Sequence, residues 1–280
     1  MKTVLYFEWT RKRQKMLKRI LGPLIVVIVL FILCTLMDIL VPQFNKVYMK
    51  WPDMLKDLLC LKSWTGHLWF NVWQLFALGY PFYLIYGGMM ELTASVIDEQ
   101  RLETMIYLNN AGISRKTLFL GKGLMWSLEM LVCCGLLLVI NVVLALILGS
   151  SQMVLNMIQY YVLLFLICLI YLAVALFMAA CKGATGVSDD AVLAVLLLPC
   201  VVSRVPALFT FFASLLQMMG REGVIADTVA HIGERIEMLT IVCPLTWCWP
   251  AFQGTILHLI FGLVVLIVMF TTGLSIYTHK

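Results

Sequence analysis

Three ionisable side chains, Glu91, Glu129 and Arg204, interrupt long apolar stretches of this sequence. A charged group is costly to place in hydrocarbon, so such a residue either marks a functional site or pairs with another polar group across helices. For Glu91 and Glu129 the competing interpretation is a hydrogen bond between helices or a partner such as Lys122. For Arg204 it is an ion pair, or a side chain that reaches toward the membrane surface instead of lining a path.

The residue patterns that mark common catalytic and metal sites are absent from the sequence. No G-x-x-x-x-G-K-[ST] phosphate loop, GxSxG elbow or HExxH helix occurs, and there is no zinc-type CxxC pair. None of the four histidines pairs with another at metal-ligand spacing. We therefore expect a chain that is not an enzyme and that carries no metal and no cofactor of its own.

The composition indicates a chain that lies in a bilayer. Hydrophobic residues make up 62% and charged residues 12% of the 280 residues, whereas a soluble domain is about half apolar and about a quarter charged. A water-facing surface needs charges and a lipid-facing surface does not. The net charge of +5 comes from basic residues near the ends of apolar stretches, which favours the membrane surface over nucleic acid as their partner.

Six apolar stretches are long enough to cross a membrane, since a helical span needs about 20 mostly apolar residues. They cover residues 20–41, 68–97, 123–148, 154–180, 191–216 and 249–277. The first is longer than a signal-peptide core and no small-x-small cleavage site follows it, so we expect it to be retained. The prediction is an all-α, polytopic membrane protein of about six transmembrane helices, with one membrane domain over residues 1–280.

The distribution of lysine and arginine predicts the orientation. Thirteen of these residues fall on the side of the N-terminus and six on the opposite side. Because loops that stay in the cytoplasm carry the excess of basic residues, both termini are expected to be cytoplasmic. We expect a multi-pass protein of the cell membrane.

Three segments outside the spans carry both apolar and charged residues, namely 1–19, 98–119 and 217–248. The first is predicted to be an amphipathic helix on the inner leaflet, or a charged flank that only orients the first span. In the third, predicted to lie outside, apolar residues recur at helical spacing at Ile225, Val229, Ile232, Ile236 and Leu239. We expect an amphipathic helix there.

Cysteines outside the apolar stretches allow one disulfide on the predicted outer side. Cys60 could meet Cys243 or Cys248 there. The alternative is plain packing at the interface, because cysteine also behaves as a small hydrophobic residue. The sequence leaves this choice open.

The segment 96–122, VIDEQRLETMIYLNNAGISRKTLFLGK, is the longest predicted cytoplasmic loop and the most charged. Leu102, Met105 and Ile106 recur at helical spacing, Gly112 breaks the helix, and Ser114 can cap the next one. The pattern predicts a short amphipathic helix held between two spans, with polar groups available to a cytoplasmic partner. An ordinary charged loop that follows the charge rule is the competing interpretation.

This segment resembles the corresponding loop of type-2 ATP-binding-cassette (ABC) exporter permeases. That family shows a glutamate, a Gly-Thr pair, a leucine-rich turn, Pro-Val-Ser-Arg, and Leu-Gly-Lys entering the third span. The matching positions here are Glu99, Thr104, Ser114, Arg115, Leu120, Gly121 and Lys122. Glu103 stands where the family has glycine and Gly112 where it has proline, and the motif covers under a tenth of the chain.

The resemblance implies a function and a set of contact residues. The loop would be the coupling helix that docks on a separate ABC ATPase subunit, which binds the ATP and Mg²⁺. Its interface residues would be Asp98, Glu99, Arg101, Glu103, Thr104, Ser114, Arg115 and Lys122. The chain would pair with a second permease half, identical or different, to form the path of an exporter for an amphipathic substrate.

Other functions remain open at this level. A mechanotransmission-type ABC permease has a similar Gly-x-Ser-Arg turn, but it carries four spans and a large outer domain. An ATP-independent transporter would favour inverted repeats, of which the sequence shows none. A membrane scaffold that only binds a partner is the third alternative.

Overall fold

The computed structural model describes residues 2–38, 42–43, 46–47, 50, 67–101, 110, 112–219, 224–248 and 256–279. Within these ranges the chain is helical and contains no strand, which confirms the all-α fold class. The α-helices are α1 (Lys2–Leu36), α4 (Leu68–Arg101), α6 (Arg115–Ile147), α7 (Ser151–Lys182), α8 (Asp189–Met218), α9 (Val224–Arg235) and α10 (Ile256–His279). Short 3-10 helices are η2 (Gly183–Thr185), η3 (Glu237–Val242) and η4 (Pro244–Cys248).

Five of these helices are long and apolar enough to cross a membrane: α1 from Lys12 on, α6, α7, α8 and α10. Helix α4 falls outside this group although it has 34 residues, because Trp, Tyr and Gly residues together with Asn71 and Gln74 dilute its hydropathy. The protein is thus a polytopic helical membrane protein. The count of six spans and the cytoplasmic termini remain predictions.

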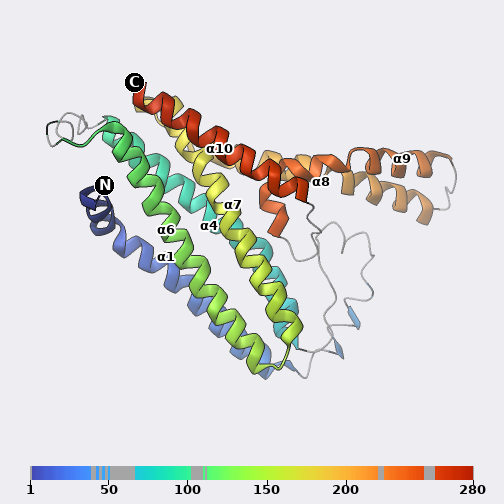
Figure 1. The fold of residues 1–280 in the computed structure, drawn as a ribbon. Helices are drawn as coiled ribbons and strands as arrows, with labels where there is room; N and C mark the ends of the chain where they lie inside the picture. Colours follow the sequence, from blue (N-terminus) through green and yellow to red (C-terminus); the bar gives the residue numbers. More distant parts are fainter. Residues whose placement is uncertain are drawn as a thin grey trace.

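Helix α7 lies at the centre of the bundle, where α4, α6 and α10 all pack against it, while α1 packs on α4 and α6 (Figure 1). It is the most buried of the five candidate spans. Helix α10 comes close to it at Gly273, where an added Cβ would lie 3.1 Å from the Phe177 backbone. Small residues that let backbones approach are typical of helix packing in membranes.

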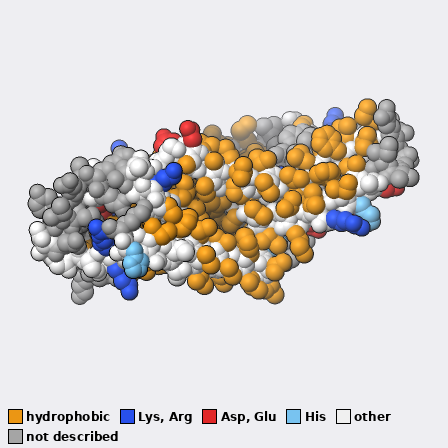
Figure 2. Space-filling model, turned by 90° about the horizontal axis from the view of Figure 1, so that it is seen from above, with side chains coloured by type: hydrophobic (Ala, Val, Ile, Leu, Met, Phe, Trp, Pro, Cys, Tyr) orange, Lys and Arg blue, Asp and Glu red, His pale blue; other side chains and the backbone are white. Residues whose placement is uncertain are grey.

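The outer surface of the bundle is apolar. Hydrophobic side chains cover most of the middle of the face seen in Figure 2, and the charged ones lie nearer its ends. The exposed residues include Ile25 on α1, Val139 on α6 and Leu263 on α10. A contiguous apolar surface of this extent would be unfavourable in water, so it indicates contact with lipid.

Hydrogen bonds at helix ends follow the sequence. The Ser114 hydroxyl accepts from the Thr117 backbone N–H at 3.2 Å and caps α6, as predicted. Ser188 caps α8 in the same way through Ala191. Gly149, with φ of +72°, lies in the tight turn that joins α6 to α7, a conformation that favours glycine.

The described part of the predicted N-terminal segment, residues 2–19, forms one continuous helix with the first candidate span. Its first turns lie at an angle to the rest of α1 in Figure 1. A buried stripe at four-residue intervals, Val4, Glu8, Lys12, Met16 and Ile20, faces the bundle. The predicted helix therefore exists, and its position on the inner leaflet remains a prediction.

Helix α9 lies within the predicted amphipathic segment 217–248 and folds back along α8 (Figure 1). Its closest contact uses small residues: Ala226 is fully buried, and Gly233 packs against Pro206 and Phe209. Ile232, a member of the predicted apolar stripe, is instead exposed. The contact with α8 therefore uses small side chains, which allow the two helices to approach, and not every member of the predicted apolar stripe.

The two neighbouring glycines of α4 give a test of the packing of α4 on α6. An added Cβ at Gly88 would collide with the Trp126 indole, whereas one at Gly87 would meet nothing within 4 Å. We expect Gly88→Ala to lower stability by about 1–3 kcal/mol through overpacking, and Gly87→Ala to be neutral or stabilising. Thermal unfolding in detergent measures the difference, and equal melting temperatures would contradict the packing.

Candidate functional site

One guanidinium joins three helices near one end of the bundle. Arg19 of α1 donates from Nη1 to Glu129 Oε1 of α6 and from Nη2 to Glu91 Oε2 of α4, both at 2.6 Å. The three side chains are 12%, 1% and 14% exposed, respectively. The guanidinium also lies 5.5 Å from the centre of the Trp126 ring. A planar fork of donors suits two carboxylates better than an ammonium would, so arginine fits this position.

A second cluster lies nearer the ends of α4 and α6 that flank segment 102–114. Lys122 of α6 donates to Glu8 of α1 at 3.0 Å and to the Ser95 carbonyl oxygen of α4 at 3.0 Å. It pairs with Glu99 of α4 at 2.7 Å. The Lys122 side chain is completely buried. Together with the Ser95 hydroxyl at 3.2 Å, four oxygens surround its three N–H donors, which offsets the cost of desolvating the charge.

These two groups, with Lys12, form what we call the ionic network: Glu8, Lys12, Arg19, Glu91, Ser95, Glu99, Lys122 and Glu129. Lys12 lies 3.9 Å from Glu8 Oε2, too far for a hydrogen bond. The network has three cations and four carboxylates. Breaking one partner of such a set leaves a buried charge without compensation, so its members are energetically dependent on one another.

The sequence predicted part of this network and missed the rest. For Glu91 and Glu129 the structure supports the competing interpretation of a bond between helices, with Arg19 as the partner of both carboxylates and not Lys122, the example that the sequence suggested. Lys12 and Arg19 count only as basic residues of the N-terminal segment in the sequence analysis, and Glu8 is not singled out there. Their spacing of four and seven residues places them on one helical face, and this was the signal that could have identified them.

The structure describes some of the predicted coupling residues and leaves others undescribed. Asp98 and Glu99 lie in the last turns of α4, whose backbone ends at Arg101, and Ser114 and Arg115 begin α6. Glu103 and Thr104 lie outside the described residues. The predicted helix between them is therefore undescribed, whereas Glu99 and Lys122, at its two ends, are in direct contact.

The third intramembrane candidate, Arg204, does not belong to the ionic network. It lies half-buried in α8, a helix that contributes no member of the network. Pro199 and Pro206 flank it within the helix. Its predicted role in lining a path remains a prediction.

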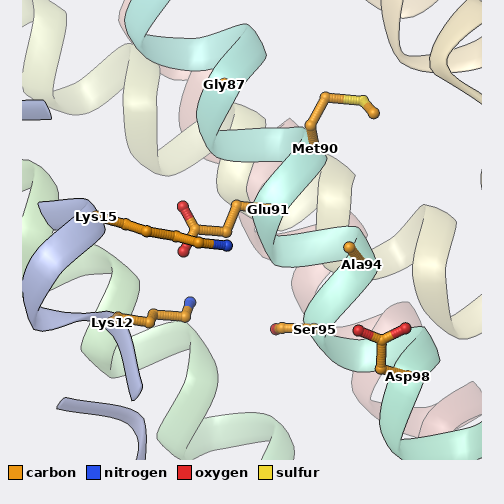
Figure 3. Close-up of a pocket in the computed structure, with 8 residues that line it drawn as sticks. All are labelled: Lys12, Lys15, Gly87, Met90, Glu91, Ala94, Ser95 and Asp98. Atoms are coloured by element: carbon orange, nitrogen blue, oxygen red, sulfur yellow. The ribbon is translucent and has the colours of Figure 1, made fainter. Parts of the chain in front are cut away.

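A polar cavity of about 330 Å³ lies beside the ionic network, between α1 and α4. Lys12 and Lys15 extend from α1 toward α4, where Glu91, Ser95 and Asp98 line the opposite wall (Figure 3). The two ammonium groups and two carboxylates give the walls both signs of charge.

The charges of the network connect helices to one another. Each of its described carboxylates lies within 4 Å of a cation, an arrangement that holds helices together. Across the described ranges, no three His, Cys, Asp or Glu side chains gather as metal ligands would. What the arrangement can do is to transmit force between α1, α4 and α6.

The structure brings Cys243 close to a cysteine that the sequence analysis did not consider as its partner, and both are free thiols. Cys243, which precedes η4, lies with its sulfur 3.2 Å from that of Cys200 in α8. Cys60 and the side chain of Cys248 lie outside the described residues. The partner of Cys243 is therefore a cysteine that the sequence placed inside an apolar span, because hydropathy does not reveal that the chain after α9 returns to α8.

The chain was compared with known protein families, with curated proteins and with solved structures, and none of them matches it. The resemblance to exporter permeases thus rests on the residues of segment 96–122 and on the helical architecture around them.

The bridging role of Arg19 predicts a large effect of its removal. Arg19→Gln leaves Glu91 and Glu129 buried without a cation and should lower stability by about 3–5 kcal/mol. Lys18→Gln, an exposed neighbour on the same helix, should change stability by less than about 0.5 kcal/mol. Thermal unfolding of the purified protein compares the two.

A triple variant separates lost charge pairing from lost shape. Arg19→Gln combined with Glu91→Gln and Glu129→Gln removes all three charges together, so it should recover most of the stability lost in the single variant. A triple variant less stable than Arg19→Gln alone would contradict the ionic explanation.

The cysteine contact predicts a pH-dependent oxidation. The hydrogen bond from Cys200 lowers the pKa of the Cys243 thiol to about 7, so the reactive thiolate forms as the pH rises through that value. Glutathione disulfide can reach half-buried Cys200 but not buried Cys243, so Cys200 forms the mixed disulfide and releases one glutathione. The Cys243 thiolate then attacks the Cys200 sulfur and releases the second glutathione, and this step should be slow below pH 7 and faster above it. Peptide mapping measures the product, and Cys200→Ser is the control.

Failure of that reaction has a clear signature. If peptide mapping finds Cys243 linked to another cysteine, the contact between the two sulfurs is wrong. If the rate is the same at about pH 6 and about pH 8, the lowered pKa of Cys243 is wrong.

Proposed function

We propose that this chain is the transmembrane permease subunit of an ATP-driven ABC exporter. The chain would form a path with a second permease half, and separate ATPase subunits would bind ATP and Mg²⁺. The observation that carries this proposal is the contact between Glu99 and Lys122, which ties together the two ends of the segment that resembles a coupling helix.

A coupling helix is useful only if its displacement moves the spans. Glu99 lies in the last turns of α4 and Lys122 in the second turn of α6, and their 2.7 Å ion pair makes the two helix ends one unit. Charge-assisted hydrogen bonds in a buried setting resist sliding more strongly than apolar contacts do. A push on the loop would therefore move α4 and α6 together.

The same lysine extends this unit to the N-terminal helix. Through Glu8, Lys122 is bonded to the first turns of α1, and Arg19 repeats the three-helix connection about 16 Å further along α1 at about 1.5 Å per residue. In exporter permeases both the N-terminal helix and the coupling helix face the ATPase. The ionic network supports a common response of both elements to one partner.

The structure supports the membrane location in general terms, without the kind of membrane or the orientation. Five helices are suited to cross a bilayer, and their outer surface is apolar. We propose that the chain lies in the cell membrane with both termini cytoplasmic, and that the substrate is amphipathic because it must pass between apolar helices. Arg204, between the prolines of α8, is the residue proposed to line the path.

A second candidate function has one specific observation in its favour. In this chain Arg19, Glu91 and Glu129 form a buried set of paired charges. ATP-independent transporters driven by protons also contain buried, paired carboxylates and cations. The dependence of transport on ATP separates the two candidates. A mechanotransmission permease would hydrolyse ATP together with its partner but would not move a substrate. A scaffold would bind its partner and would not move a substrate either.

The proposal predicts a difference between two neighbouring cations at the start of α6. Arg115 holds the family's Ser-Arg position, and Lys116 is exposed beside it. The full chain, tagged and purified from its native membrane, should bring down an ATPase with a phosphate loop. Arg115→Gln should reduce coupled ATP hydrolysis about tenfold, an ordinary coupling energy, and Lys116→Gln should leave it unchanged.

The controls for this experiment are the amount of folded protein and the partner itself. Both variants must show the melting temperature of the parent chain. If no ATPase is captured, or if Arg115→Gln and Lys116→Gln hydrolyse ATP at the same rate with the partner bound, the exporter assignment fails.

A further inference from the structure

The seam between α1 and α4 contains two cavities, one polar and one apolar, on the same faces of the two helices. The polar cavity is the one beside the ionic network, lined by Lys12 and Lys15 of α1. An open apolar groove of about 470 Å³ lies further along the seam, lined by Pro23 and Val26 of α1 and by Phe76 and Tyr83 of α4.

The two cavities follow one another along the same face of α1, as the spacing of their lining residues shows. On α1 the lining residues Lys12, Lys15, Gly22 and Val26 recur at intervals of three, seven and four, which is one helical face. From Lys12 to Val26 the helix rises about 21 Å at about 1.5 Å per residue. That length fits a headgroup followed by the hydrocarbon of one leaflet, which is about 15 Å.

Lys12 supplies an independent indication of a ligand. Its side chain is only 4% exposed, yet its Nζ has no hydrogen-bond partner within the described part of the chain. The nearest carboxylate oxygen, Glu8 Oε2, is 3.9 Å away. A buried ammonium whose donors are unfilled is costly, and an acceptor group in the adjoining cavity would satisfy it.

The charges of the cavity walls select the kind of headgroup. Lys12 and Lys15 on α1 suit a phosphate, and Asp98 on the α4 wall suits an ammonium. A ligand with both a phosphate and an ammonium matches these walls better than a simple anion, which would face two carboxylates.

We propose that a phospholipid with a phosphoethanolamine headgroup binds in the α1–α4 seam, with its phosphate on Lys12 and Lys15, its ammonium near Asp98, and an acyl chain in the groove at Val26. The apolar groove is what distinguishes a lipid from a soluble phosphate ester. The site shares Asp98 with the predicted coupling interface, but its test measures lipid binding without an ATPase, so the two proposals can fail separately.

The test uses the full chain in detergent with three probes: phosphatidylethanolamine, phosphatidylglycerol and soluble glycerophosphoethanolamine. Lipid retained per chain is counted by mass spectrometry, and the melting temperature is measured with each probe, since a ligand that binds only the folded state raises it. Phosphatidylethanolamine should be retained and should raise the melting temperature. Glycerophosphoethanolamine should have little effect at equal concentration.

Matched variants locate the bound lipid. Lys15→Gln should reduce retained phosphatidylethanolamine at least threefold, a change of about 0.7 kcal/mol, and exposed Lys18→Gln should not. Val26→Phe fills the groove and should have the same effect, whereas Val29→Phe, at an exposed position outside the groove, should not. Lys15, Val26 and their controls are all exposed, so these variants are expected to fold.

Three results would overturn the proposal. Lys15→Gln and Val26→Phe could retain as much lipid as their controls, which would remove the site. Glycerophosphoethanolamine could stabilise the chain as well as the lipid does, which would indicate a soluble phosphate ester. Phosphatidylglycerol could be preferred, which would contradict the pairing of an ammonium with Asp98.

Discussion

The structure depends on one constraint: charges that lie between apolar helices must find partners on those helices. Arg19 can bridge Glu91 and Glu129 only when α1, α4 and α6 have one relative rotation and one relative height. Apolar side chains alone would tolerate several such arrangements, because hydrophobic contact is not directional. The ionic network thus selects the packing of this half of the bundle.

The half around α7 and α10 is held by different means. Here Gly262 and Gly273 of α10 let that helix approach Ile170, Trp247 and the Phe177 backbone. A few neutral hydrogen bonds add specificity to this region, such as that from Asn141 to the Tyr161 hydroxyl at 2.9 Å. One half of the chain is therefore connected through charge and the other through close packing.

The helices could be predicted and their partners could not. Hydropathy locates apolar stretches because a span must be about 20 residues long, and the cap at Ser114 follows from local chemistry. Partner choice depends on the relative rotation of helices far apart in sequence, so the sequence could suggest Lys122 as a partner of Glu91 and Glu129 but could not identify Arg19. The contact of Cys200 with Cys243 and the small-residue face of α9 were missed for the same reason.

The sequence separation within the Arg19 bridge has a consequence for synthesis. Glu129 follows Arg19 by 110 residues, which at about 5–20 residues per second is roughly 5–20 s of translation. During that interval α1 has no α6 to pair with, and its charged turns must stay in water or be held by the insertion machinery. Helix α1 can therefore take its final position only after α6 has left the ribosome.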